Sequence, residues 1–444
     1  MRRTRILGPV LIVVAILVSV MGAGSTPQQP TLNKLDAETA RKMLHDAYDA
    51  VKRYYYDPKY HGINLDARLE EYDARIGSAG SFGQAFGVIA AFLEGLKDSH
   101  TFFNPPARAS RLDYGYRMQM IGDGCFITRV RPSTDAESKV HPGDQVITYD
   151  GFDVNHGDFH SIRYYFSVLA PQPASKLGLR DPAGSQRELV VDAKVEELKK
   201  MMDLTTSGGG TDIWDLVRQE ENEDHVIRER MVETADVTIW KMPEFFLHDN
   251  EVDGAFGSIR KHKTLILDLR GNPGGAIVTL ARVIGNVFDH DVKIADRVGR
   301  KESKPQVAKT IGGNAFAGKL IVLVDSDSAS ASELFARVVQ IEHRGTVIGD
   351  RTAGAVMEAK HYPYSEGIDT KVFYGFSVTD ADLIMTDGKS LENSGVTPDE
   401  IVLPTSQDLA AGRDPVLARA AELAGFHLDP AAAGKLFPFE WVRF

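Results

Sequence analysis

The chain is poor in cysteine: Cys125 stands alone among 444 residues, so an internal disulfide is excluded. Its stability must come from buried apolar side chains, which a chain of this length can supply. It also lacks clustered positive charge, and its formal net charge is -11. Because nucleic-acid phosphates are bound by basic clusters, the composition argues against a nucleic-acid partner.

Long apolar runs are also scarce, and the exception lies at the start. Arg2, Arg3 and Arg5 precede a largely apolar run over 6–21, which small residues follow. This order is typical of an export signal, so we expect 1–25 to be a signal peptide or a membrane anchor. The chain is then exported: periplasmic, secreted, or membrane-anchored and facing outside the cytoplasm.

The remaining composition is globular, with 43% hydrophobic and 25% charged residues, and the length favours two or three domains. Apolar spacing over 35–56 and 81–96 predicts a helical N-terminal domain at 31–106. Alternating strands and turns predict a small β domain at 110–196. Flexible and charge-dense stretches predict a connector or insertion at 197–235.

Two segments each predict a strand, a tight turn and a helix. They are Thr264-Leu-Ile-Leu-Asp-Leu-Arg-Gly-Asn-Pro-Gly-Gly275 and the stretch from Leu320 through Ser330 to Ile341. Glycines in the first turn let backbone N–H groups face a ligand, and the second places a hydroxyl where a helix begins. Hydrogen-bond donors beside a nucleophile suggest acyl transfer.

The β domain contains a Pro142-Gly143-Asp144 turn, an apolar strand and an Asp150-Gly151 turn. This order resembles the second half of a PDZ domain. Such domains add the C-terminal end of a peptide as an extra strand and hold its carboxylate on backbone N–H groups. The resemblance implies a peptide-binding site at Tyr114, Gly115 and Tyr116. The alternative is a β module that only positions the catalytic core.

Three motifs, taken in order, resemble the C-terminal processing, or tail-specific, serine peptidases and their tricorn-like and retinoid-binding relatives. They are Asp268-Leu-Arg-Gly-Asn-Pro-Gly-Gly275, Ser328-Ala-Ser-Ala-Ser-Glu333 and the stretch 387–399. The resemblance covers nearly the whole mature chain. It implies an α/β fold with a helical N-terminal subdomain, a PDZ-like module, a ClpP/crotonase-like peptidase core at 236–405 and a helical tail at 406–444.

By the same resemblance, the family nucleophile is Ser330. Tail-specific members take their base from a Thr-Phe-Gly-Lys-Gly stretch, but Thr352-Ala-Gly-Ala-Val356 has no lysine. Tricorn-like members instead use a histidine after a serine, and a glutamate; Ser99, His100 and Glu392 match these. Histidine titrates near neutrality, which suits a general base, and a carboxylate can orient it.

Each residue also has a plainer interpretation: Ser330 as part of a helix N-cap, His100 as a capping group, and Glu392 as a loop carboxylate. Lys360, eight positions beyond Thr352, is the rival base.

The oxyanion donors we expect are the backbone N–H groups of Gly274 or Gly275 and of Ala331. The stretch 313–319 has the spacing of a phosphate-binding loop, but Leu320 replaces the hydroxyl residue that such loops need, so we reject nucleotide binding. Without paired histidine and glutamate on a helix, or a cysteine cluster, we expect no metal and no cofactor.

The function that these observations favour is an exported serine endopeptidase. It cleaves extended or unfolded polypeptides, including near their C-termini, through an acyl-enzyme on Ser330. Two alternatives stay open: a noncatalytic protein that binds peptide ends or apolar ligands on the same scaffold, and a Ser-Lys peptidase that uses Lys360.

Overall fold

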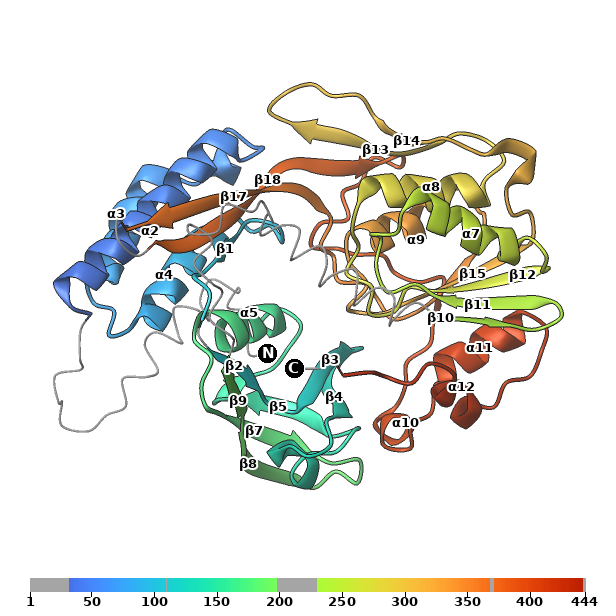
Figure 1. The fold of residues 1–444 in the computed structure, drawn as a ribbon, viewed down its shortest axis with the longest axis horizontal. Coiled ribbons are helices and arrows are strands. Elements are labelled where there is room, and N and C mark those ends of the chain that lie inside the picture. Colours follow the sequence, from blue (N-terminus) through green and yellow to red (C-terminus); the bar gives the residue numbers. More distant parts are fainter. Residues whose placement is uncertain (1–31, 109, 198–229, 368–370, 442–444) are drawn as a thin grey trace, which may run out of the picture.

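The computed structural model describes residues 32–108, 110–197, 230–367 and 371–441. The fold is mixed α/β, as expected, and three parts surround a common centre (Figure 1). The expected export signal and most of the expected connector lie outside the described residues. Among the described helices, none has the length and apolar character to cross a membrane.

The first part is helical, as expected. It consists of α2 (Lys34–Tyr54), α3 (Leu65–Ile76) and α4 (Phe82–Glu94). Each begins after a side chain that accepts a backbone N–H from the first turn, namely Asn33, Asn64 and Ser81. Beyond α4 the chain passes through Ser99 and His100 into β1 (Phe102–Asn104).

A long hairpin joins these helices to the rest of the molecule. It consists of β17 (Met357–Glu366) and β18 (Val372–Met385). Strand β1 pairs with β18, as does β13 (Val292–Gly299), which in turn pairs with β14 (Gln306–Ala308). The sequence did not predict this hairpin. Because of it, the end of the N-terminal part lies beside strands that are almost 300 residues away in the chain.

The second part is a small antiparallel sheet ordered β3-β4-β5-β7-β8, with β6 beside β5. Its strands are β3 (Tyr116–Ile121), β4 (Gly124–Val130), β5 (Gln145–Tyr149), β6 (Phe152–Asp153), β7 (Ala174–Arg180) and β8 (Gln186–Asp192). Its helix α5 (Phe159–Tyr164) continues as a π-helical turn, η3 (Tyr165–Leu169), and β2 (Ser110–Asp113) pairs with β9 (Lys194–Glu197). The strands expected over 125–130 and 188–192 are confirmed.

The third part is built on a six-stranded sheet, parallel except for its first strand. In spatial order its strands are β10 (Arg230–Glu233), β11 (Val237–Lys241), β12 (Thr264–Asp268), β15 (Lys319–Val324), β16 (Thr346–Gly349) and β19 (Glu400–Ile401). Strand β10 lies within the stretch expected as a connector and pairs with β11, so it adds one strand to this sheet.

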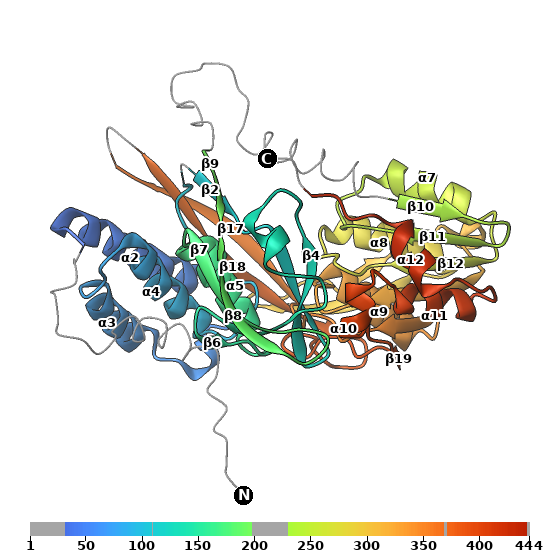
Figure 2. The same cartoon turned by 90° about the horizontal axis from the view of Figure 1, so that it is seen from below.

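Helices cover both faces of this sheet (Figure 2). One group is α7 (Asp249–Ile259), α8 (Ile277–Val287) and α9 (Ala331–Ile341); the other is α11 (Pro415–Leu423) and α12 (Pro430–Leu436), preceded by α10 (Ser406–Ala410). Alternate strand residues divide between the two cores: Leu265 and Leu267 pack with the first group, and Ile266 with the second. Short 3-10 turns complete the fold: η1 (Tyr60–Gly62), η2 (Asp135–Ser138) and η4 (Gly312–Asn314).

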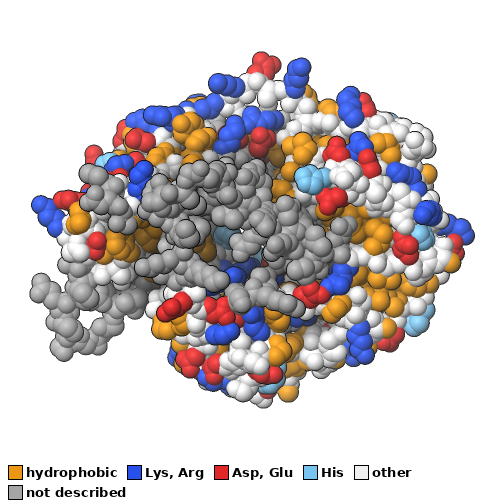
Figure 3. Space-filling view, in the orientation of Figure 1, with side chains coloured by type: hydrophobic (Ala, Val, Ile, Leu, Met, Phe, Trp, Pro, Cys, Tyr) orange, Lys and Arg blue, Asp and Glu red, His pale blue; other side chains and the backbone are white. Residues whose placement is uncertain are grey.

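Acidic and basic side chains are interspersed over the described part of the face shown in Figure 3. The glycine turn at 271–275 and the turn that carries Ser330 lie instead where β12 and β15 end. These strands are parallel neighbours, so their carboxyl ends share one edge of the sheet. In parallel sheets this edge is where binding sites usually form.

Candidate active site

The two turns expected to carry the chemistry lie against each other. A side-chain carbon added to Gly274, in the turn after β12, would come 2.6 Å from Cβ of Ser330, in the turn after β15. Only glycine permits so close an approach. The glycine turn and the candidate nucleophile are therefore in contact.

Ser330 lies directly before α9 in a strained backbone conformation, with φ +54° and ψ -114°. Two hydrogen bonds of 3.0 Å fix its N–H, one to the carbonyl of Ala355 and one to Glu333 Oε2. Non-glycine residues in this region cost free energy and cluster at functional sites. The fold thus holds the hydroxyl at the positive end of a helix.

The expected oxyanion donors divide into two groups. The N–H groups of Gly275 and Ala331 have no acceptor among the described residues. The N–H of Gly274, by contrast, donates to Asn272 Oδ1 at 2.9 Å, and Asn272 Nδ2 donates to the carbonyl of Met242 at 2.9 Å. The N–H of Gly274 is thus already engaged, which favours Gly275 among the two expected alternatives.

A hydrogen-bonded path connects Glu392 to His100 through Ser99. Ser99 Oγ donates to Glu392 Oε2 at 2.9 Å and lies 2.7 Å from His100 Nδ1, while the Ser99 N–H donates to Glu392 Oε1 at 2.6 Å. Since the serine hydroxyl has one hydrogen, it must accept from Nδ1–H. This tautomer leaves Nε2 of the neutral ring free to take a proton.

The same carboxylate is linked to Ser330 through two consecutive residues. Glu392 Oε2 accepts the N–H of Val356 at 2.8 Å, and the carbonyl of Ala355 accepts the N–H of Ser330. The structure thus links His100 to Glu392 through Ser99, and it links the backbone of Ser330 to the same carboxylate through the segment of Ala355 and Val356.

Burial sets the protonation of these groups. It lowers the pKa of His100 against the opposing effect of Asp98, and it raises the pKa of Glu392 to about 7 despite the hydrogen bonds from Val356 and Ser99. At neutral pH the imidazole is accordingly uncharged and able to act as a base.

Two acidic residues that the sequence interpretation passed over support this arrangement. Glu333, fully buried, accepts hydrogen bonds from Thr352 Oγ1 and from the N–H groups of Gly354 and Ala355, at 2.5 to 2.9 Å. It therefore anchors the stretch in which tail-specific relatives carry lysine. Asp98 Oδ1 accepts the backbone N–H of His100 at 3.0 Å. The position of Glu333 in the first turn of a helix was the only local signal.

The remaining candidates lie elsewhere. Lys360, on β17, is 62% exposed, and its Nζ lies 2.5 Å from Asp380 Oδ2, so it is already paired. The hydroxyl of Tyr114 donates to the carbonyl of Gln172, and that of Tyr116 lies 2.8 Å from Ser175 Oγ. The N–H of Gly115 donates to Asp113 Oδ1 at 2.9 Å. These groups are thus used within the small-sheet part.

Residues 234–402 match the model of peptidase family S41, and residues 36–83 match the tricorn protease C1 domain. The chain carries an S41 peptidase domain. This match supports a serine-type peptidase. The S41 match includes Ser330 and Glu392, whereas His100 lies between the two matched segments.

Similar proteins include the tail-specific protease of Haemophilus influenzae, 26% identical over 67% of this chain and 41% of its own length. The carboxyl-terminal-processing protease of Synechocystis is 23% identical over 82% of this chain and 81% of its own. A putative tricorn protease homolog of Streptomyces coelicolor is 25% identical over 86% of this chain and 33% of its own length. The chain thus spans less than half of the first and third of these proteins.

Among solved structures, that of mature CPAF superposes with a TM-score of 0.63, over 85% of this chain and 95% of that one, at 16% identity. At this identity the similarity concerns the fold.

Proposed function

We propose that this protein is a serine endopeptidase that acts through an acyl-enzyme on Ser330. His100 is the general base, and Glu392 orients it through Ser99. The observation that carries the proposal is the path from Glu392 through Ser99 to His100 Nδ1, which leaves Nε2 as the ring nitrogen that can accept a proton.

The proposed reaction uses these residues in turn. Ser330 Oγ attacks the peptide carbonyl carbon while Nε2 of His100 takes the hydroxyl proton, and the oxyanion forms opposite the N–H groups of Gly275 and Ala331. The imidazolium then gives its proton to the leaving nitrogen as the C–N bond breaks. Water then attacks the ester while the same ring takes its proton, and the imidazolium returns that proton to Ser330 Oγ as the acyl C–O bond breaks and the acid leaves.

We assign extended or unfolded polypeptides as substrates, including their C-terminal ends. The names of the relatives, tail-specific and carboxyl-terminal-processing protease, support this class. The small sheet supports a PDZ-like module, because among the described strands β3 pairs with β4 alone and so forms one edge of the sheet. An edge strand can accept a peptide as an added strand. The layered sheet of the third part supports a ClpP/crotonase-like core.

We further assign the N-terminal segment 1–25 to export, with 31–106, 110–196 and 236–405 as the three folded domains and 406–444 as the tail. The basic and apolar start of the chain supports the export assignment.

Cleavage of a denatured protein tests the proposal. Wild-type protein should produce fragments, and Ser330→Ala should reduce the rate by several orders of magnitude while binding the same peptides. A wild-type protein that binds a peptide tightly but cleaves no member of a denatured library would contradict the proposal and favour the noncatalytic alternative.

The rival base is tested in the same assay. Lys360 belongs to an exposed ion pair, so Lys360→Ala should retain wild-type cleavage, and His100→Ala should lose it. The opposite pattern would assign the base to Lys360.

A further inference from the structure

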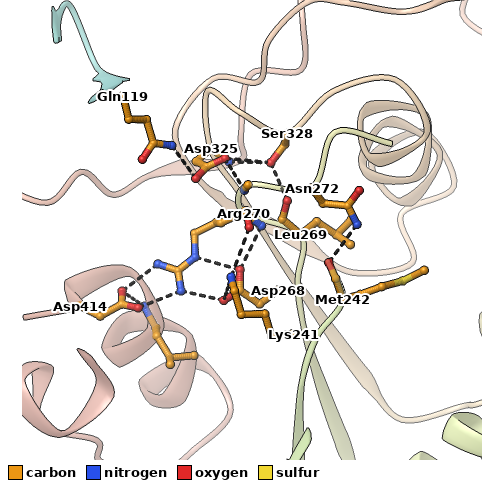
Figure 4. Close-up of polar contacts among 12 residues, drawn as sticks. Gln119, Lys241, Met242, Asp268, Leu269, Arg270, Asn272, Asp325, Ser328 and Asp414 are labelled. Carbon is orange, nitrogen blue, oxygen red and sulfur yellow. Dashed lines mark hydrogen bonds and ion pairs between the residues drawn. The ribbon is translucent and has the colours of Figure 1, made fainter. Parts of the chain in front are cut away.

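A cluster of charged side chains lies at the start of the glycine turn, residues 271–275 (Figure 4). Arg270 donates from Nε and Nη2 to the two oxygens of Asp268, at 2.9 and 2.8 Å. Its Nη1 and Nη2 also donate to the two oxygens of Asp414, at 2.9 and 2.8 Å. One guanidinium therefore holds two carboxylates in bidentate geometry, which fixes direction as well as distance.

The cluster is largely withdrawn from solvent. The side chains of Asp268, Arg270 and Asp414 are 0%, 17% and 18% exposed. Lys241 Nζ adds a second cation, 3.3 Å from Asp268 Oδ2, and donates to the carbonyl of Arg270 at 3.2 Å. Burial alone would raise the pKa of Asp414, but Arg270 outweighs it and the pKa is lowered, so Asp414 carries its charge.

Paired charges of this kind add little net stability, because desolvation offsets most of their attraction. Their geometry is nevertheless fixed, since removing one partner leaves the other buried and unpaired. The cluster is therefore better suited to holding a position than to strengthening the core.

The cluster holds the start of the glycine turn, which carries the proposed oxyanion donor Gly275. Arg270 is followed by Gly271, whose N–H donates to Asp325 Oδ1 at 2.8 Å, and by Asn272, whose carbonyl accepts the N–H of Ala329 at 3.0 Å. These contacts tie the middle of the turn to the turn that carries Ser330. Arg270 ties its start to Asp414, in the C-terminal part of the chain.

Asp414 reaches the turn from the opposite face of the sheet. It precedes α11, whose N-terminal Leu417 N–H it also accepts at 2.9 Å. Helix α11 packs in the core formed with Ile266, whereas α8, which follows the turn, packs in the core formed with Leu265 and Leu267. The turn is thus held between two rigid layers.

We propose that Asp414 is a positioning residue for the oxyanion donor at Gly275, acting through Arg270 on the start of the glycine turn. This inference rests on the proposed function, because it names what the turn is held in place to do. A donor displaced by about 1 Å from the developing charge can cost about 100-fold in rate.

The substitution Asp414→Asn tests the inference sharply. Asparagine keeps the oxygen that caps α11 but loses the charge that holds Arg270. Asp408→Asn is the matched control, because Asp408 lies in the same tail, caps α10 through Thr405 and pairs with Arg413, at 2.7 Å, away from the turn. We expect kcat on a disordered substrate to fall about 10- to 100-fold in Asp414→Asn, with KM little changed, and Asp408→Asn to match wild type.

A second readout does not depend on activity. Hydrogen exchange of the backbone amides over 271–275 should be faster in Asp414→Asn than in Asp408→Asn, and peptide binding measured in a Ser330→Ala background should be equal in the two. If Asp414→Asn is unfolded by circular dichroism, Asp414→Glu, which keeps the charge at a different reach, takes its place with an expected fall of about tenfold.

Two results would overturn the inference: equal exchange of these amides in both variants, or a loss confined to KM. A wild-type protein that cleaves nothing would reject the proposed function instead, and the exchange rates would still decide the role of Asp414.

Discussion

The two turns at the edge of the large sheet follow neighbouring parallel strands and precede helices, yet they are held in different ways. The turn after β12 is rich in glycine, with positive φ at Gly271, Gly274 and Gly275, and is anchored by charges as distant in sequence as Asp414. The turn after β15 is anchored in part by polar groups of its own. The buried Ser328 Oγ, for example, accepts the N–H of Asp325 at 2.9 Å. The first turn supplies the N–H of Gly275, which has no acceptor among the described residues; the second forces a serine into a conformation that favours glycine.

The largest effect on turnover is expected at Glu392, which orients His100, the base proposed for Ser330 in the second turn. Glu392→Gln should leave folding and peptide binding nearly intact but lower turnover by orders of magnitude, because His100 loses its orientation and the charge that stabilises its protonated form. Turnover of a disordered substrate measures this.

The double variant with Ser330→Ala provides the control. It should cleave the substrate hardly more slowly than Ser330→Ala alone, since the effects of substitutions within one catalytic unit are not additive. Two losses that multiply would show that Glu392 acts outside that unit.

The next effect concerns the contact between the turns. Gly274→Ala places a methyl group 2.6 Å from Ser330 Cβ, so kcat should fall about 100-fold. Gly271→Ala is the matched control: its φ is also positive, but an added carbon meets no atom within 4 Å, so it should lose only about 1 kcal/mol of stability. Equal kcat values for the two would contradict the packing described here.

Both strand, turn and helix units could be predicted from the sequence, because short apolar runs, glycines and helix starts are local signals. The proximity of Ser99, His100 and Glu392 was implied by family resemblance alone. The hairpin of β17 and β18 and the pairing of Arg270 with Asp414 could not be predicted, because each joins residues far apart in sequence. The hydrogen bond from the N–H of Gly274 to the side chain of Asn272 could not be predicted either, because no spacing rule shows it.

A smaller effect on kcat/KM is expected from a change of pH. Catalysis needs Glu392 ionised and His100 neutral, and burial raises the pKa of the first to about 7 while lowering that of the second. The value of kcat/KM should therefore rise with pH to a midpoint near 7 and fall about tenfold per unit below it. In Glu392→Gln the midpoint should move below about 6.5, the ordinary value for histidine. A midpoint well above 7 in wild type would instead indicate a lysine base.

The smallest effect is on stability. At φ +54°, Ser330→Gly relieves backbone strain that Ser330→Ala retains, so the glycine variant should have the larger free energy of unfolding, by about 1 kcal/mol. Both variants lack the hydroxyl and should be inactive. Urea denaturation measures the difference, and an alanine variant as stable as the glycine variant would mean that the turn is not strained.

The most direct test of the central claim, that Ser330 is a nucleophile activated by His100, is labelling by a serine-directed phosphonate followed by peptide mass mapping. The account predicts one adduct, on Ser330 of the wild-type protein, and a rate of labelling in folded His100→Ala that is lower by orders of magnitude. An adduct on another serine, or equal labelling of Ser330 in both proteins, would contradict it.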